Sequence, residues 1–190
     1  MKHILNKTQA MKITKQPVIP LKADKKNPIL AGWQKTSITE LTCFSKRKRG
    51  SNWGVRCDNI VVVDVDAKPE NAATAIRDME AFKSRILELD TYIVSTRSGN
   101  PHAYFAIDER MKDWRKRVGL WGFVDICIGA QSQVVAAGSV VEGKTYKEVK
   151  RDDINRMPDW LFDEINIEML RGQKEIRERV VKEHHSQLSH

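Results

Sequence analysis

The stretch that decides the fold is Ile60-Val61-Val62-Val63-Asp64-Val65-Asp66. Its β-branched residues predict a buried β-strand, the strongest in the chain. Because side chains alternate along a strand, Asp64 and Asp66 share one face with Val62, whereas the other face receives Val61, Val63 and Val65. The strand therefore ends with two carboxylates on the same side.

Two carboxylates this close are costly unless cations neutralise them, and hard oxygen ligands suit Mg²⁺ or Mn²⁺. A strand that runs out into solvent could also end in acidic residues at little cost. Asp125 favours the metal site, because it lies inside the apolar run Phe123–Ile128, where an unpaired carboxylate would be expensive to bury. We therefore interpret Asp64, Asp66 and Asp125 as candidate ligands of divalent cations.

A second polar group surrounds a predicted turn. The segments Tyr92–Thr96 and His102–Ile107 are expected to form a β-hairpin around Ser98-Gly99-Asn100-Pro101. His102, Arg97 and Ser98 offer an imidazole, a guanidinium and a hydroxyl beside backbone N–H groups, a set that suits a triphosphate. A hairpin with ordinary polar residues is the alternative, and it would be preferred if the carboxylates were absent.

The other segments mix strands and helices without strict alternation, which favours the α+β class over a doubly wound sheet. In chain order we expect a strand at Asn52–Arg56 with a tight turn at Cys57–Asn59, a helix from Pro69 to about Leu89, a short helix from Glu109 to Val118, a strand pair at Val124–Ile128 and Gln133–Ala137, and a helix that begins at Pro158.

Charge is unevenly distributed along the 190 residues, although the composition is that of an ordinary globular domain. Residues 1–60 hold 13 Lys and Arg against 3 Asp and Glu, which leaves 20 against 22 for the rest. The densest basic cluster is Lys46-Arg47-Lys48-Arg49, a weak candidate for DNA binding. For a run of four residues taken alone, a solvated basic loop is the preferred alternative.

Several classes of protein are disfavoured. No apolar run is long enough to span a bilayer and no signal peptide is present, so we expect a cytoplasmic protein without a membrane partner. The cysteines are few and widely separated, which predicts buried reduced thiols and no zinc site; they are Cys43, Cys57 and Cys127. The motifs of P-loop ATPases, serine hydrolases and zinc proteases are also absent.

An ordered series of motifs resembles the bifunctional primase-polymerase (Prim-Pol) branch of the archaeo-eukaryotic primase superfamily, known chiefly from plasmids, phages and integrated elements. The motifs are Lys25-Lys26-Asn27-Pro28 leading to Gly32-Trp33-Gln34, Asn52-Trp53-Gly54-Val55 before Val62–Asp66, Thr96–Phe105, Val124-Asp125-Ile126 followed by Val134–Ser139, and Met157-Pro158-Asp159-Trp160-Leu161. The family's second motif is often written Ser-x-His, whereas position 100 here is Asn and the nearest serine is Ser98.

The resemblance implies a primase-like catalytic core with an RRM-like antiparallel or mixed sheet flanked by helices. It implies metal binding by Asp64, Asp66 and Asp125, and contact of His102 with the nucleotide phosphates, assisted by Arg97 and Ser98. We therefore expect a flexible basic leader over residues 1–16, a primase-polymerase catalytic domain over 17–165 and a charged helical tail over 166–190. A helical bundle or helicase, which many relatives carry, would be supplied from elsewhere.

Template-directed nucleotidyl transfer is therefore the predicted function, in replication of a plasmid, phage or integrated element. The partners would be a single-stranded DNA template, a primer, dNTP or NTP, and two Mg²⁺ or Mn²⁺ ions, with Asp64, Asp66, Asp125 and His102 as catalytic residues. Two alternatives stay open, a replication-associated DNA-binding module with little catalysis and a divalent-metal nuclease. The choice between ribose and deoxyribose, the preferred metal and primer synthesis de novo are not decided by the residues.

Overall fold

The computed structural model describes residues 14–36, 52–66 and 73–172. The chain forms two compact units, Met1–Arg156 and Met157–His190. All the described strands lie in the first unit, together with helix α3 (Ala73–Leu87). This arrangement agrees with the predicted α+β class.

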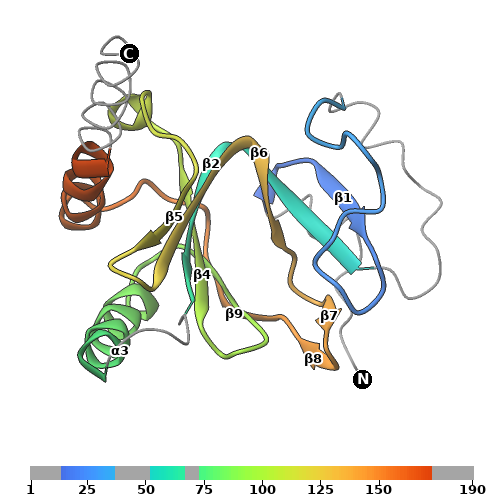
Figure 1. Ribbon diagram of the computed structural model, residues 1–190, viewed down its shortest axis with the longest axis horizontal. Helices are drawn as coiled ribbons and strands as arrows, with labels where there is room; N and C mark the ends of the chain where they lie inside the picture. Colours follow the sequence, from blue (N-terminus) through green and yellow to red (C-terminus); the bar gives the residue numbers. More distant parts are fainter. Residues whose placement is uncertain (1–13, 37–51, 67–72, 173–190) are drawn as a thin grey trace, which may run out of the picture. The chain divides into compact units, whose positions relative to one another are not determined.

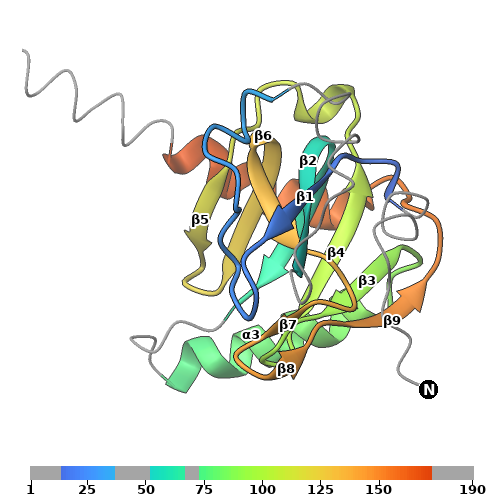
Figure 2. The same cartoon turned by 90° about the vertical axis from the view of Figure 1, so that its right-hand side faces the viewer.

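The first unit is built on a seven-stranded sheet in which every strand pair is antiparallel. Its strands are β1 (Val18–Leu21), β2 (Asn52–Val65), β3 (Tyr92–Ser95), β4 (Pro101–Ala106), β5 (Arg117–Leu120), β6 (Val124–Val135) and β9 (Lys147–Arg151). The order is β5-β6-β2-β4-β3-β9, and β1 also pairs with β2. Figure 2 shows this order from β5 at one edge to β9 at the other. The most hydrophobic strand, β2, is therefore central.

The predicted tight turn at Cys57–Asn59 is wrong, because β2 runs through it as one strand (Figure 1). The register against β6 shifts on both sides of Cys57, which marks a β-bulge. Side chains hold the bulge extended: Arg56 donates two hydrogen bonds to Asp58, and the amide of Asn59 donates to Gln16 Oε1 at 3.0 Å. At this bulge β2 changes its partner from β1, which pairs with residues 52–55, to β4, which pairs with residues 60–64.

Two further expectations are corrected by long-range pairing. The predicted strand pair at Val124–Ile128 and Gln133–Ala137 is one strand, β6, which follows the bend of β2. The predicted helix at Glu109–Val118 is only a 3₁₀ turn at Glu109–Met111, capped by Asp108, and the chain then enters β5. Pairing of β5 with β6 overrides the local helical pattern.

The hairpin of β3 and β4 is confirmed, with Val94 opposite His102. Helix α3 ends two residues before the predicted limit at Leu89, and the predicted start at Pro69 lies outside the described residues. Its buried face includes Phe82, whose ring centroid lies 5.5 Å from that of Trp121 and 5.9 Å from that of Phe123. The helix is therefore tied to the chain that links β5 to β6.

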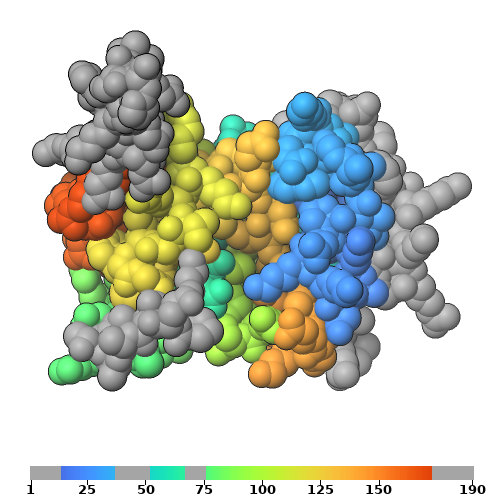
Figure 3. Space-filling view, in the orientation of Figure 1, coloured from blue at the N-terminus to red at the C-terminus, as the bar shows by residue number. Residues whose placement is uncertain are grey.

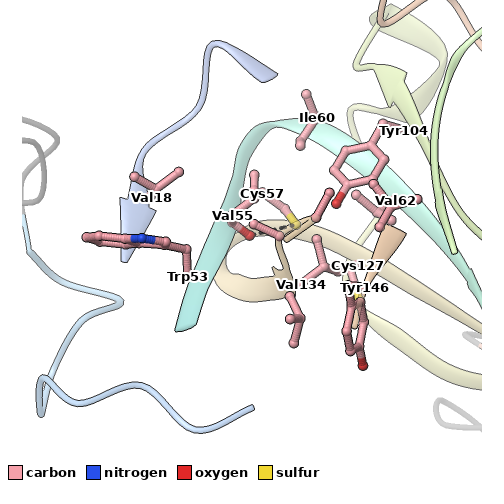
Figure 4. Close-up of a cluster of buried hydrophobic side chains, with 14 of the residues drawn as sticks. Val18, Trp53, Val55, Cys57, Ile60, Val62, Tyr104, Cys127, Val134 and Tyr146 are labelled. Atoms are coloured by element: carbon pink, nitrogen blue, oxygen red, sulfur yellow. Dashed lines mark hydrogen bonds between the residues drawn. The ribbon is translucent and has the colours of Figure 1, made fainter. Parts of the chain in front are cut away.

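A cluster of buried apolar side chains fills the space beside β2, β4 and β6 (Figure 4). Val62 of β2, Tyr104 of β4 and Cys127 of β6 all belong to it. Cys57 and Cys127 are buried free thiols, as predicted, and burial raises the pKa of both; Cys43 lies outside the described residues.

The segment around Asp24 lies against a small hairpin formed by β7 (Val140–Val141) and β8 (Lys144–Thr145). Figure 3 shows the two in contact. Asp24 forms an isolated bridge with Val141, and its Oδ1 accepts a hydrogen bond from the amide of Gly143 at 2.9 Å. The loop before residue 30 is thereby fixed beside this hairpin.

In the second unit, residues 159–172 are helical, and the amides of Leu161 and Phe162 donate to the carbonyl of Pro158. The predicted helix start at Pro158 is confirmed. The predicted tail over 166–190 is described only as far as residue 172. Within the described part of the chain, no helix combines the length and the apolar character needed to cross a membrane.

Candidate active site

Strand register brings the predicted site residues together. Asp64 of β2 lies opposite His102 of β4 on one side and opposite Asp125 of β6 on the other. Residues directly opposite each other in an antiparallel pair project from the same face of the sheet. Three strands therefore place an imidazole and two carboxylates on one face, where the sequence predicted them.

Asp66 lies one residue beyond β2, and its amide still donates to the carbonyl of Phe123 at 2.8 Å. Burial raises the pKa of Asp66 above its usual range, and the negative charges of Asp64 and Asp125 raise it further. Lys26 and His102 act in the opposite direction. All three carboxylates thus share one electrostatic environment with an excess of negative charge.

Hydrogen bonds orient two of these carboxylates. Nε2 of His102 lies 3.1 Å from Oδ1 of Asp64, and the amide of Gly119 donates to Oδ1 of Asp125 at 2.7 Å. His102 is buried, and its Nδ1 has no hydrogen-bond partner among the described residues. The His102 ring is therefore turned toward Asp64.

The carboxylates fit a divalent cation in donor type and in charge, since Mg²⁺ and Mn²⁺ prefer oxygen ligands. As the side chains stand, no three His, Cys, Asp or Glu residues in the described ranges converge closely enough to hold a metal ion. Asp125 is the residue most clearly engaged elsewhere, by the Gly119 amide.

A small pocket of about 50 Å³ opens beside the carboxylates. It is lined by Lys26, Asp64, Asp66, Thr96, Arg97, Ser98, His102 and Tyr146. Five of the predicted site residues line this pocket, whereas Asp125 does not. The pocket combines anionic groups on β2 with cationic and hydroxyl groups from three other parts of the chain.

The turn between β3 and β4 supplies Arg97 and Ser98. The amide of Thr96 donates to the carbonyl of Asn100 at 2.8 Å, and the amide of Gly99, with φ of 85°, donates to the carbonyl of Thr96 at 3.0 Å. This positive φ favours glycine. Arg97 forms an ion pair with Glu142, which lies between β7 and β8. The turn is thus linked to the neighbouring hairpin at the pocket.

Lys26 is a site residue whose chemistry the sequence did not reveal. Its carbonyl accepts a hydrogen bond from Nε2 of Gln133 at 3.0 Å. The Gln133 side chain passes so close to Gly54 that a Cβ at this position would collide with it. The sequence offered a signal at this position in the motif Lys25-Lys26-Asn27-Pro28, which assigned no role to Lys26.

Tyr146 and Thr96 also line the pocket without having been predicted. Tyr146 lies between β8 and β9, and its ring centroid is 5.9 Å from that of His102. Burial, followed by the charge of Asp64, raises the pKa of Tyr146 to about 12. Its place in a polar, charged segment gave no indication of this position.

The basic cluster Lys46-Arg47-Lys48-Arg49 lies outside the described residues. Its suggested role in DNA binding therefore stays a prediction.

Comparison with known proteins identifies the family. The model of the bifunctional DNA primase/polymerase N-terminal domain (Prim-Pol) matches residues 9–160, which is most of the chain. No curated protein matches the sequence. The match spans the strands that carry the carboxylates and His102, and the family indicates DNA primase/polymerase activity on DNA and nucleotide substrates. The chain therefore belongs to the Prim-Pol family of bifunctional DNA primases/polymerases.

Proposed function

We propose that this protein extends a nucleic-acid strand on a single-stranded DNA template, using dNTP or NTP as substrate. The observation that carries this proposal is the register of β2, which sets Asp64 opposite both His102 and Asp125. Next to this arrangement lies a pocket that also contains Lys26 and Arg97. Phosphoryl transfer requires mainly positioning and charge stabilisation, and these residue types supply both.

Asp64, Asp66 and Asp125 would hold Mg²⁺ or Mn²⁺ in this proposal. When bound, divalent cations would favour ionisation of the primer 3′-hydroxyl and stabilise the charge of the departing pyrophosphate. Asp66 supports the assignment, because burial and then the charge of Asp64 raise its pKa, and a cation would offset both effects.

The other residues of the pocket would hold the nucleotide. Arg97 and Lys26 carry the positive charge that a triphosphate needs, and Ser98 adds a hydroxyl donor from the same turn as Arg97. His102 would contact the phosphates while keeping Asp64 oriented, since it lines the pocket and its Nε2 lies 3.1 Å from Oδ1 of Asp64. The nucleotide's α-phosphorus would then face the 3′-hydroxyl, with pyrophosphate as the leaving group.

The wider setting is also proposed. The protein would act in replication of a plasmid, phage or integrated element, with a helicase or helical-bundle domain supplied by another chain. The Lys46–Arg49 cluster would track the template backbone by charge.

The decisive experiment is extension of a labelled primer on a single-stranded template, with wild type beside Asp64→Ala. We expect wild type to extend the primer with Mg²⁺ or Mn²⁺, and Asp64→Ala to lose at least about a hundredfold in rate. A hundredfold is the upper range for mutating an outer-shell partner of a metal ligand, and a direct ligand should cost at least this much. Circular dichroism would verify that the variant is folded.

Other outcomes would point to other functions. Equal activity of Asp64→Ala and wild type would contradict the assignment of the site. Degradation of the DNA when nucleotides are withheld would favour a nuclease. Metal-independent DNA binding without nucleotide turnover would favour a binding module.

A further inference from the structure

Tyr146 occupies the wall of the pocket without a function assigned to it. It is the single residue between β8 and β9, and its backbone is fixed at both polar groups. Its amide donates to the carbonyl of Ser139 at 2.9 Å, and its carbonyl accepts from the amide of Gly138 at 2.8 Å. Two backbone hydrogen bonds therefore hold this position against the turn that follows β6.

The turn after β6 is itself hydrogen-bonded to β2, the strand that carries Asp64. The hydroxyl of Ser139 accepts from the amide of Trp53 at 3.0 Å and donates to its carbonyl at 3.2 Å. Val140 accepts from and donates to the side chain of Asn52 in the same way. Tyr146 is thus held, through the turn after β6, by the first residues of β2.

The tyrosine ring and its hydroxyl face different surroundings. The ring is buried in the apolar cluster near Cys127 and Val134, whereas the hydroxyl points away from this cluster (Figure 4). The residue lines the pocket together with Asp64 and Arg97, and both affect the pKa of its phenol. No hydrogen bond joins the hydroxyl to any of the described residues.

Tyr104 provides the contrast within the same cluster. Its hydroxyl is also without a hydrogen-bond partner among the described residues, but it is enclosed in the core and lines neither the pocket nor the surface. Because the ordinary pKa of a tyrosine phenol is about 10, both hydroxyls keep their protons at neutral pH. Both side chains are fully buried, but of the two only Tyr146 borders the pocket.

We infer, on the basis of the nucleotidyl-transfer function proposed above, that the Tyr146 hydroxyl donates a hydrogen bond to a phosphate oxygen of the bound nucleoside triphosphate. A protonated phenol beside Asp64 and Asp66 is a donor, and the cations that would attract an anion, Lys26 and Arg97, line the same pocket. Tyr146 and His102 would then contact the same phosphates from adjacent rings.

The test compares Tyr146→Phe with Tyr104→Phe in the full chain. Each change removes one unpartnered hydroxyl and keeps the ring, so packing is matched. Calorimetric titration with dATP and with ATP, without DNA, would measure nucleotide affinity, and primer extension would separate KM from kcat. We expect Tyr146→Phe to weaken nucleotide binding about tenfold and to raise KM by a similar factor, with kcat within about twofold. Tyr104→Phe should bind nucleotide like wild type.

The outcomes separate this inference from the proposed function. Unchanged affinity of Tyr146→Phe, in a background where wild type binds nucleotide, would overturn the phosphate contact alone and leave a packing role. Equal losses in both variants would also overturn it, because they would indicate an effect of core packing. Absence of nucleotide binding by folded wild type would overturn the proposed function and this inference together. Thermal melting of both variants would establish that they fold.

Discussion

Carboxylates occur at both ends of the β2–β4 strand pair, and the protein surrounds them differently. At the end near the bulge, Arg56 donates to both oxygens of Asp58 at 2.6 Å, and Asp108 accepts from Arg110 and Arg156. At the other end, Asp64 contacts the imidazole of His102, and Asp125 accepts a hydrogen bond from the backbone amide of Gly119. Arginine is the better partner for a carboxylate that serves only the fold, because its planar fork binds both oxygens.

The pKa shifts follow the same division. Hydrogen bonds from Arg110 hold the pKa of Asp108 below its usual range, whereas burial and the neighbouring carboxylates raise the pKa of Asp66. The negative charge of Asp108, near the bulge, therefore stabilises the fold, whereas the negative charge of Asp66, at the pocket, destabilises it. Functional sites commonly carry such a cost. Substitutions at the two ends should consequently have opposite effects on stability.

The largest effect is expected for Arg56→Ala. The Arg56–Asp58 pair is buried, and the guanidinium also donates to the carbonyls of Trp33 and Thr36. Removing one partner of a buried pair leaves an uncompensated charge, so we expect a loss of about 3–5 kcal/mol in the free energy of unfolding. Urea denaturation would measure it.

The matched control is Arg151→Ala, which removes an exposed arginine paired with Glu148. A surface pair contributes about 0.2–1 kcal/mol. Similar losses for Arg56→Ala and Arg151→Ala would contradict the special contribution of the buried Arg56–Asp58 pair.

Asp66→Asn should separate activity from stability. We expect primer extension to fall at least about a hundredfold, as for a metal ligand, while the thermal midpoint at neutral pH stays equal to that of wild type or rises. The sign follows from the raised pKa: protonated Asp66 favours the fold below the usual carboxyl range, near pH 4, and this contribution is lost as pH rises through the folded value. Thermal melting from pH 3 to pH 8 would check it, and a fall in the midpoint at neutral pH would contradict it.

Asp108→Asn should have the smallest effect and the opposite sign. Because the Asp108 pKa is lowered, its contribution to stability is present above the usual carboxyl pKa and is lost as pH falls through the folded value. Its pairs are partly exposed to solvent, so we expect a loss of about 1 kcal/mol at pH 7. Urea denaturation at pH 7 and at pH 3 would measure the difference, which should shrink at the lower pH.

The sequence predicted those features that depend on local pattern. The alternation over residues 60–66 placed Asp64 and Asp66 on one face, and the turn residues around Gly99 predicted the hairpin that carries Arg97 and His102. Asp125 could be assigned because a carboxylate in an apolar run is unusual. Each of these signals lies within a few residues of the position that it describes.

The remaining features depend on contacts between distant segments. The turn-like residues Cys57–Asn59 are held extended by Gln16, more than 40 residues away in the sequence. Lys26 is held beside the site by a hydrogen bond from Gln133 to its carbonyl. Tyr146 is held by a hydrogen bond to Ser139, which in turn bonds to Trp53. None of these pairings leaves a trace in local periodicity, so the pocket could be predicted only in part.

The bulge in β2 also sets the phase of the strand. Before it, the residues that enter the apolar cluster have odd numbers, Trp53, Val55 and Cys57; after it they have even numbers, Ile60 and Val62. The irregular register on both sides of Cys57 therefore shifts the two-residue repeat by one step. In an unbroken repeat, Asp64 would project from the face opposite to Trp53 and Val55. This irregular segment thus determines on which side of the sheet Asp64 stands.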